Sequence, residues 1–413
     1  MEEWKEYRLG DLIELKNGFA FKSKDFIQSG IPVIKIKNVK PNRILLDDLS
    51  FVAAETAQHQ RCVKILPTDI LITMTGNRKD GGSDSWVGKV ALFKKEGEFL
   101  LNQRVAAIKV KRHDIINYKY LAYLLSSWES QLYFINNSNS SGGQANISPE
   151  IVNNYIIYIP SLYTQNSISN ILSSIDDKIE LNRRINENLE QQAQALFKSW
   201  FVDFEPFKDG KFVDSELGMI PEGWKVIELQ SMVTIKRGGS PRPIQEYLSE
   251  TGLRWLKISD VTCNSSPFIL EIKEHIKESG LNKTVLLNKG ELVLSNSATP
   301  GIPKFLGVDS CIHDGWLYFP VSSLSKEFLY LLFKEKRNEL LSQGNGSVFL
   351  NLKTEIVKSL KVAICSKNTL KKFDDIIMPI FNKIFELSLE IDRLTKLRDA
   401  LLPKLMTGEI KVN

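Results

Sequence analysis

The longest hydrophobic pattern in the chain is a stripe that recurs at every seventh residue in two separate segments. One segment runs from about residue 165 to 200 and the other from about 370 to 402. Side chains at this spacing share one face of an α-helix, and a stripe kept over four heptads needs a partner helix to cover it. The stripe positions are Ile168, Ile175, Asn182, Leu189 and Leu196 in the first segment, and Phe373, Ile380, Leu387, Leu394 and Leu401 in the second. The pattern predicts two long helices that pair with each other in a coiled coil.

Two residues interrupt these stripes. Asn182 lies within the first stripe, where one polar residue can fix the register of a coiled coil; the alternative is that it faces solvent at the edge of the stripe. Pro379 lies within the second stripe, where it removes one backbone hydrogen bond. The proline is therefore expected to kink that helix or to begin it.

The rest of the chain contains one long internal repeat. Residues 4–18 align with 224–238, the segment from Gly30 aligns with that from Gly252, and Leu101-Asn102 aligns with Ile312-His313. In both copies short apolar strands alternate with polar, glycine-rich loops, and one short helix follows (118–131 and 327–341) before a closing strand. The strands and turns repeat while the polar loop residues change. The repeat therefore predicts two similar binding domains with different specificities.

Together these patterns predict an α+β protein, in which two similar α/β domains are joined and separated by two long helices forming an antiparallel coiled coil. The expected boundaries are 1–160 for the first domain, 161–205 for the first helix, 206–365 for the second domain and 366–413 for the second helix. Helices of this length span roughly 50 Å. If they are antiparallel, they suit a pair of DNA half-sites about 34–36 Å apart on one face of the duplex.

Composition narrows the class of protein. The 413 residues are 43% hydrophobic and 25% charged, with a net charge of +5, which is typical of a globular protein and compatible with a nucleic-acid partner. No apolar run is long enough to span a membrane, and the first residues do not resemble a signal peptide. The four cysteines form no C-x-x-C pair and the four histidines lack metal-ligand spacing. We therefore expect a cytoplasmic protein without a membrane segment or a metal site.

The sequence also lacks the motifs of enzymes that act on DNA. An adenine methyltransferase is expected to carry an Asn/Asp-Pro-Pro-Phe/Tyr motif, and the chain has no Pro-Pro pair. The segment closest to a phosphate-binding loop, Gly82 to Val90, has one residue too many and lacks the Ser/Thr. Glu271-Ile272-Lys273 matches a nuclease fragment that arises often by chance, and we interpret it as an exposed segment. No catalytic residue is predicted.

Specific residues at the domain junction carry a resemblance to a known family. Residues 196–207 read LFKSWFVDFEPF, and residues 218–224 read GMIPEGW. This junction, the opening segment 7–39 and the loop 141–148 resemble specificity subunits of Type I restriction–modification enzymes, and the resemblance covers essentially the whole chain. The family often has a proline-rich turn that ends in Glu-Gln where the helix begins. This chain keeps only Gln165 of that pair in the first copy and neither residue in the second.

The resemblance implies a division of labour among subunits. The chain would bind double-stranded DNA at an asymmetric, bipartite site, one half per domain. Two methyltransferase subunits would methylate adenine at N6 with S-adenosylmethionine, and motor-nuclease subunits using ATP and Mg²⁺ would cleave; this chain itself would bind no cofactor. The alternatives are a coiled-coil adaptor that binds protein only, the specificity module of a different restriction architecture, and a self-sufficient DNA-modifying enzyme, which the missing motifs oppose.

Candidate DNA contacts are polar and basic residues in the variable loops, because phosphate is bound by Lys and Arg and base edges are read by Arg, Asn and Gln. For any one of them the alternative is an ordinary solvated side chain. Lys35 and Lys37 alternate with Ile34 and Ile36 and are expected to share one strand face. The candidates are Lys16, Lys35, Lys37, Arg78, Lys79, Asn102, Gln103, Arg104, Gln144 and Asn146 in the first domain, and Lys236, Arg237, Arg242, Lys257, Asn296, His313, Asp314 and Asn351 in the second.

Overall fold

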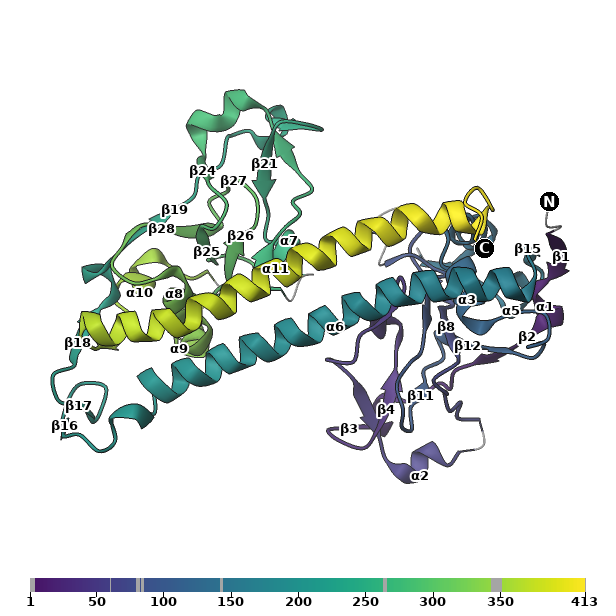
Figure 1. The fold of residues 1–413 in the computed structure, drawn as a ribbon, viewed down its shortest axis with the longest axis horizontal. Helices are drawn as coiled ribbons and strands as arrows, with labels where there is room; N and C mark the ends of the chain where they lie inside the picture. The colour runs from purple at the N-terminus through teal and green to yellow at the C-terminus, as the bar shows by residue number, and fades with distance from the viewer. Residues whose placement is uncertain are drawn as a thin grey trace. The chain divides into compact units, whose positions relative to one another are not determined.

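Two helices of 40 residues each, α6 (Leu162–Phe201) and α11 (Lys367–Met406), are the longest elements of the protein (Figure 1). The computed structural model describes residues 4–412, apart from residue 60 and residues 79–81, 83–84, 142–143, 263–265 and 343–350. The chain forms two compact units: the first comprises residues 1–177 and 395–413, and the second comprises residues 178–394. Each long helix therefore contributes one part to each unit.

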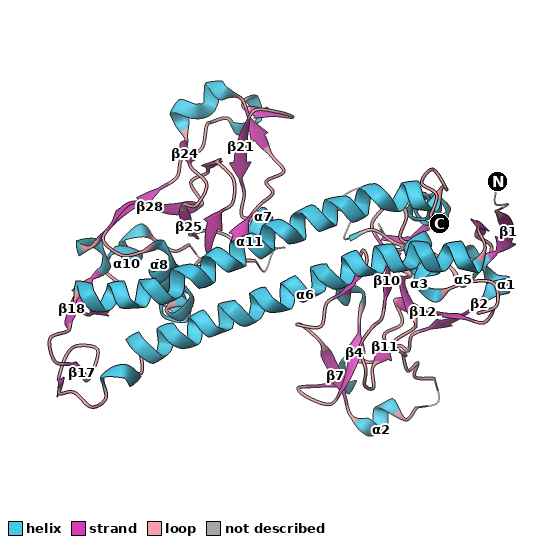
Figure 2. Ribbon diagram, in the orientation of Figure 1, coloured by secondary structure: helices cyan, strands magenta, loops and turns pink. Residues whose placement is uncertain are grey.

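Both units combine short strands with short helices (Figure 2). The remaining elements of the first unit are β1 (Lys5–Arg8), α1 (Leu9–Leu12), β2 (Ile13–Asn17), β3 (Phe26–Ile27), β4 (Ile31–Ile34), β5 (Val39–Lys40), β6 (Arg43–Ile44), β7 (Ser50–Val52), α2 (Ala54–Ala57), β8 (Ile70–Thr73), β9 (Thr75–Gly76), β10 (Val90–Leu92), β11 (Leu100–Leu101), β12 (Val105–Val110), α3 (Tyr118–Leu125), α4 (Trp128–Asn137), β13 (Asn139–Ser141), β14 (Gln144–Asn146), α5 (Pro149–Asn153) and β15 (Ile156–Ile159). Those of the second unit are β16 (Phe212–Val213), β17 (Ile220–Pro221), β18 (Lys225–Glu228), β19 (Val233–Arg237), β20 (Leu248–Ser249), β21 (Leu253–Leu256), α7 (Ser259–Thr262), β22 (Phe268–Ile269), β23 (His275–Ile276), β24 (Val285–Leu287), β25 (Leu292–Ser295), β26 (Pro303–Leu306), β27 (Ser310–Ile312), β28 (Trp316–Ser322), α8 (Lys326–Glu335), α9 (Arg337–Ser342), α10 (Thr354–Lys358) and β29 (Lys361–Ile364).

The strand pairings confirm the internal repeat. The central sheet has the order β2-β12-β8-β10 in the first unit and β19-β28-β25-β26 in the second, where β22 is added at the edge. A parallel pair, β4 with β11 and β21 with β27, recurs in both units. The opening strand of each unit pairs with its closing strand, β1 with β15 and β18 with β29. The central strands are almost wholly buried, which explains their continuous apolar sequence.

The short helix predicted in each unit is two helices. In the first unit α3 ends at Leu125 and α4 begins at Trp128, because the Ser127 hydroxyl accepts a hydrogen bond of 3.3 Å from the Ser130 backbone N–H and caps a new helix. In the second unit α8 and α9 are separated at Lys336. Hydrophobic spacing continues through both breaks, so the pattern alone does not reveal them.

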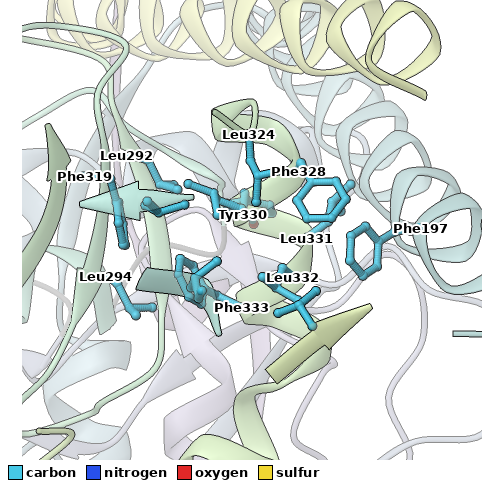
Figure 3. Close-up of a cluster of buried hydrophobic side chains, with 14 of the residues drawn as sticks. Phe197, Leu292, Leu294, Phe319, Leu324, Phe328, Tyr330, Leu331, Leu332 and Phe333 are labelled. Carbon is cyan, nitrogen blue, oxygen red and sulfur yellow. The ribbon is translucent and has the colours of Figure 1, made fainter. Parts of the chain in front are cut away.

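The core of the second unit includes side chains from both long helices. Phe197 of α6 lies beside Phe328 of α8, with ring centroids 5.2 Å apart (Figure 3). Phe201 of α6 contacts Phe373 of α11 edge to face at 4.8 Å. In the first unit, Ile168 of α6 and the end of α11 belong to one cluster with α3. Each helix stripe therefore packs against a globular core as well as against the other helix.

This double packing changes which stripe positions are deepest. Ile168, Phe373 and Leu387 are buried, as is Asn182, whereas the other predicted positions are half-buried: Ile175, Leu189, Leu196, Ile380, Leu394 and Leu401. The most deeply buried apolar residues include neighbours offset from that stripe, such as Leu172, Ile179 and Ala193 in α6 and Ile377 and Ile384 in α11. The prediction that the other long helix covers the hydrophobic stripe was incomplete. The globular cores also cover apolar residues of both long helices.

The pairing of α6 with α11 in the second unit is antiparallel and contains polar side chains. The Asn182 Nδ2 donates to the Glu390 Oε2 at 2.9 Å, and the Asn186 Nδ2 donates to the Ser388 Oγ at 3.2 Å. As the residue number rises along α6, the residue number of its partner in α11 falls, as expected for antiparallel helices. Asn182 is fully buried, so of the two interpretations of its position the one inside the seam is correct.

The beginnings of the two long helices differ from the sequence-based expectation. α11 begins at Lys367 and continues through Pro379, so the proline does not begin the helix. Gln165 lies inside α6 and is fully buried: its Nε2 donates to the carbonyls of Ile115 and Pro160, both at 2.9 Å, and its Oε1 accepts from the Asn117 N–H at 2.9 Å. The Gln165 side chain thus links α6 to the globular domain by hydrogen bonds. The second copy has the apolar Leu370 at the corresponding position.

Candidate nucleic-acid interface

In the first unit, three distant segments meet around Gln144 on β14. This strand pairs with β9, which places Asn146 opposite Thr75. The Arg104 Nη1 donates to the Gln144 Oε1 at 3.4 Å. The Arg78 Nη2 donates to the Ser138 carbonyl at 2.7 Å, next to the neighbouring strand β13. Four of the sequence-predicted residues (Arg78, Arg104, Gln144 and Asn146) are thus brought together by the fold.

Asn102 and Gln103 adjoin this group through the turn before Arg104. The Asn102 N–H donates to the Ile34 carbonyl at 3.0 Å, which places Asn102 beside the end of β4 and hence beside Lys35. The Gln103 N–H donates to the Phe19 carbonyl at 3.0 Å, and the Gln103 side chain is exposed. Amide donors and acceptors therefore lie next to basic side chains on this part of the unit.

The expectation that Lys35 and Lys37 share one strand face was wrong. β4 ends at Ile34, and Ile36–Asn38 form a 3-10 turn in which the Asn38 side chain accepts from the Lys35 N–H at 2.9 Å. The Lys35 ammonium lies 3.5 Å from the centre of the Phe26 ring, and burial, aided by the charge of Lys37, lowers its pKa. Lys37 forms an ion pair of 2.5 Å with Asp48. The alternating sequence could not reveal this, because the turn depends on a local side-chain hydrogen bond.

Lys16 belongs to a separate hollow in the first unit. It lies on β2, where its ammonium pairs with Glu14 at 3.3 Å. The hollow has a volume of about 610 Å³, and Arg61, Lys64 and Lys109 also line it. Lys79, the remaining candidate of the first domain, lies outside the described residues.

In the second unit, three predicted residues line one pocket. Arg242, Lys257 and His313 come from the loop after β19, the end of β21 and the turn after β27, and they surround a volume of about 790 Å³. Trp255 forms part of the wall and is almost wholly buried. Residues that are far apart in sequence thus form one concave site.

Asp314 organises the basic side chains at this site. Its Oδ1 accepts a hydrogen bond of 2.6 Å from the Ser240 hydroxyl, and its Oδ2 lies 3.2 Å from the Arg242 Nη2 and 3.8 Å from the Arg237 Nη2. The Arg237 Nε also donates to the Asp314 main-chain carbonyl. The Ser240 hydrogen bond and, further, the charge of Arg237 hold the pKa of the Asp314 carboxyl below its ordinary value. One ionised carboxylate therefore orients two guanidinium groups.

His313 is neutral in this arrangement. Its Nδ1 accepts a hydrogen bond of 2.7 Å from the Gly315 N–H, which leaves the ring proton on Nε2. Burial lowers the pKa of His313 below its ordinary value, although the Asp314 carboxylate opposes that shift. A neutral imidazole is a flat ring with one N–H donor, and His313 lines the pocket with 18% of its side chain exposed.

The other candidates of the second domain lie around this site. Lys236 is exposed on β19, next to Arg237. Lys257 pairs with Glu274. Asn296 is only 5% exposed: its N–H bonds to the Gly315 carbonyl at 2.9 Å, and its carbonyl accepts from the Leu352 N–H at 2.8 Å, which places exposed Asn351 beside it. Asn296 thus supports the loop instead of presenting its amide at the surface.

Two equivalent glycines set the close packing of each site. A Cβ on Gly18 would lie 2.2 Å from the Asn102 carbonyl oxygen, and a Cβ on Gly238 would lie 2.3 Å from the His313 carbonyl oxygen. Both glycine N–H groups are hydrogen-bonded to the neighbouring central strand, at 3.0 and 2.8 Å. Neither backbone can move aside without breaking its sheet.

We expect Gly238→Ala to destabilise the second unit by about 1–3 kcal/mol, since an added methyl group has no space. We also expect it to displace His313 and Asp314, whereas Gly18→Ala should disturb only the Asn102 turn. Hydrogen–deuterium exchange across both units measures these effects. Gly210→Ala, at an exposed turn where the nearest atom lies at 3.2 Å, is the control. Equal exchange in Gly238→Ala and wild type would contradict the prediction.

Sequence reasoning missed three residues of the second site. Ser240 and Glu274 are small or acidic and did not stand out among basic candidates, and the apolar Trp255 was not among the candidates. The glycines 238–239 before Ser240 were a usable signal, because they mark a turn at the end of a basic strand. Glu274 and Trp255 gave no comparable signal, since their roles depend on strands that pair only in the folded unit.

The chemistry of both sites is that of binding. Guanidinium, ammonium and amide groups suit phosphate oxygens and base edges. Among the residues that the structure describes, no group of three or more His, Cys, Asp or Glu side chains is placed to hold a metal ion. Within that same part of the chain, no helix has the length and apolar character needed to cross a membrane.

Known proteins resemble this chain over its full length. The Type I restriction enzyme MjaIX specificity subunit of Methanocaldococcus jannaschii is 28% identical, with 100% of this chain and 94% of that protein covered. The Type I restriction enzyme HindI specificity subunit of Haemophilus influenzae is also 28% identical, with 99% and 100% covered. The crystal structure of the S subunit of a Type I restriction–modification system from M. genitalium has a TM-score of 0.58 at 16% identity, covering 98% of this chain and 96% of that one, which shows a shared fold.

The repeat seen in the two units also has a counterpart in the family comparison. The sequence model described as the Type I restriction modification DNA specificity domain matches residues 1–191 and again residues 221–397. Each match contains the central sheet of one unit and most of the long helix that follows it. The chain therefore belongs to the Type I restriction modification DNA specificity family, as a non-catalytic specificity subunit with two target-recognition domains and two long connecting helices.

Proposed function

We propose that this chain recognises an asymmetric, bipartite site in double-stranded DNA, with one half-site read by each target-recognition domain. The observation that carries the proposal is the repeated fold with different side chains at equivalent places: Asn102 and Gln103 in the first unit stand where His313 and Asp314 stand in the second. One scaffold with two sets of polar groups suits two different base sequences.

The partners in this proposal supply the chemistry. Two methyltransferase subunits bind the chain and transfer a methyl group from S-adenosylmethionine to adenine N6 in each half-site. Motor-nuclease subunits use ATP and Mg²⁺ to restrict unmodified DNA. The chain itself determines where on the DNA the complex binds. Support comes from the names of the relatives, which are specificity subunits of Type I restriction enzymes.

The test is to co-express the chain with the methyltransferase encoded beside it and to map N6-methyladenine across the host genome. We expect a split, asymmetric motif that is methylated on both strands and disappears when the chain is deleted. A stable complex that methylates no such motif would overturn the proposal.

Arg78 offers a quantitative check on phosphate binding. We expect Arg78→Ala to weaken DNA binding and to reduce the slope of log affinity against log salt by about 0.9, the value for one lost phosphate contact. Arg112→Ala is the control, because Arg112 follows the far end of β12, away from Arg104, and pairs with Asp114 at 2.7 Å. Fluorescence anisotropy of labelled DNA, titrated with the protein at about 50 to 200 mM salt, measures the affinity and its salt dependence. A slope unchanged from wild type would remove Arg78 from the interface.

A further inference from the structure

The pocket of the second unit has walls suited to a flat aromatic ring. Pro241, Pro243 and Ile244 come from one loop and Ile258 from another, and all four line the volume of about 790 Å³. Trp255, 2% exposed, supports His313, with ring centroids 6.0 Å apart. Ligand pockets commonly have volumes of about 300–1,000 Å³ and are mostly apolar, with a few fixed polar groups. This pocket has that character.

Two cations at the pocket each have an acidic partner within the protein. The Arg242 side chain is 78% exposed and is held by Asp314 at 3.2 Å. Lys257 is held by Glu274. Two cations that come from separate segments and line one pocket suit the phosphates on either side of one nucleotide.

We propose that this pocket binds one nucleotide whose base has left the base stack, with the base against His313 and the phosphates near Arg242 and Lys257. Stacking on a ring and hydrogen bonding to an exposed edge are how proteins hold an extrahelical base. The neutral His313 offers both the flat face and the Nε2 proton. The inference rests on the proposed function, because the DNA bound by the second domain is the source of the nucleotide. A free mononucleotide has the same chemistry and is the other source.

The first domain gives an internal comparison. Asn102 occupies the place of His313, since Gly18 approaches the Asn102 carbonyl as Gly238 approaches that of His313. An asparagine amide can bond to a base edge but offers no aromatic ring. The unstacked base is therefore expected in the half-site read by the second domain.

The experiment scans the methylated motif with duplexes in which one base at a time is replaced by an abasic site. Removing the opposite base lowers the energy of unpairing, so binding of the full-length chain should tighten about tenfold at one position of one half-site and weaken elsewhere. Gln245→Trp, at an exposed residue of the pocket wall, should fill the pocket and abolish the tightening. His313→Asn, which installs the residue of the first copy, should reduce it. Glu250→Trp adds the same ring at an exposed residue outside the lining and should leave the scan unchanged.

Titration of the full-length chain with each of the four deoxynucleoside monophosphates separates the two sources. Tightening at one position that is lost in Gln245→Trp supports a nucleotide from DNA. Mononucleotide binding that is lost in Gln245→Trp, without a tightened position, would assign the pocket to free nucleotides and overturn the DNA source. Neither effect, or tightening that survives in Gln245→Trp, would overturn the pocket proposal. If methylation mapping gives no motif, the proposed function fails, and the mononucleotide titration still decides the pocket.

Discussion

Replacing Arg398 by methionine is expected to lower the local free energy of unfolding of the first unit by about 3–5 kcal/mol, the usual loss when one partner of a buried ion pair is removed. The Arg398 Nη1 lies 2.9 Å from the Asp176 Oδ1, and the two side chains are only 14% and 16% exposed. Asp176 also accepts a hydrogen bond of 2.6 Å from the Tyr123 hydroxyl of α3. Without Arg398 the carboxylate would stay buried with one neutral partner.

The Arg398–Asp176 ion pair and the Tyr123 hydrogen bond link three elements of the first unit: α3, the first half of α6 and the end of α11. Hydrogen–deuterium exchange of the buried strands β8 and β12 measures the local free energy, since a chain of two units does not unfold in one step. Lys94→Met is the matched control within the same unit, because Lys94 pairs with Asp177 at 3.0 Å with side chains that are 50% and 68% exposed. That exposed pair should contribute less than about 1 kcal/mol.

A second variant separates the buried charge from the lost packing. Replacing both residues, as Arg398→Met with Asp176→Leu, should recover most of the stability, because an apolar pair of similar volume has no charge to desolvate. A single variant that loses under 1 kcal/mol, or a double variant no better than the single, would contradict this account of the junction.

The sequence predicts the fold best where a pattern repeats. Heptad spacing identified both long helices, and the alignment of residues 4–18 with 224–238 identified the two units. The heptad spacing does not reveal whether a partner helix or a globular core covers the apolar stripe, because both bury Leu and Ile side chains. The adjacent residues Ile171 and Leu172 are both apolar, yet Ile171 is 38% exposed and Leu172 is fully buried against the first core.

The candidate sites were predicted in part, for a related reason. Basic and amide residues in loops could be recognised one by one, and the fold gathers Arg104 with Gln144 and Arg242 with His313. Which of these residues come together depends on strands that pair far apart in the sequence, such as β21 with β27, where Trp255 pairs with Cys311. Whether these residues contact DNA stays a prediction. The pocket itself could not be foreseen, because its walls come from four separate segments.

Lys304 gives the second large expected effect, on the dependence of stability on pH. This lysine of β26 is 5% exposed, and its ammonium donates to the Ser266 carbonyl. Burial lowers its pKa from 10.5 to about 8, against the attraction of Glu190, while Lys334 lowers it further. Glu190 is already engaged by Lys334 at 2.9 Å and by the Tyr330 hydroxyl at 2.7 Å. Burial therefore outweighs the attraction of Glu190 and favours the neutral form of Lys304 in the folded unit.

The direction of the effect follows from proton binding. Between pH 8 and 10.5 the unfolded chain keeps the Lys304 proton while the folded chain releases it, so this residue makes stability rise with pH across that window. At 1.36 kcal/mol per pKa unit the rise is about 3 kcal/mol. Below pH 8 the cost of burying the charge is fully present.

We therefore expect Lys304→Met to stabilise the second unit at pH 7 by about 2 kcal/mol, after allowing about 1 kcal/mol for the lost hydrogen bond to Ser266. The advantage should shrink as pH rises through 8 and vanish at about pH 9.5. Near pH 10.5 the variant should be less stable by about 1 kcal/mol, because the wild-type lysine is then neutral in both states while the variant still lacks the hydrogen bond. Denaturant titrations from pH 7 to 11, followed through exchange of β25 and β28, measure the difference. Lys326→Met, at a partly exposed pair with Glu291, should change stability by under about 1 kcal/mol. A Lys304→Met variant that is less stable than wild type at pH 7 would mean that Glu190 and Ser266 compensate the charge fully, and Lys304 would then be a stabilising link between β26 and α6.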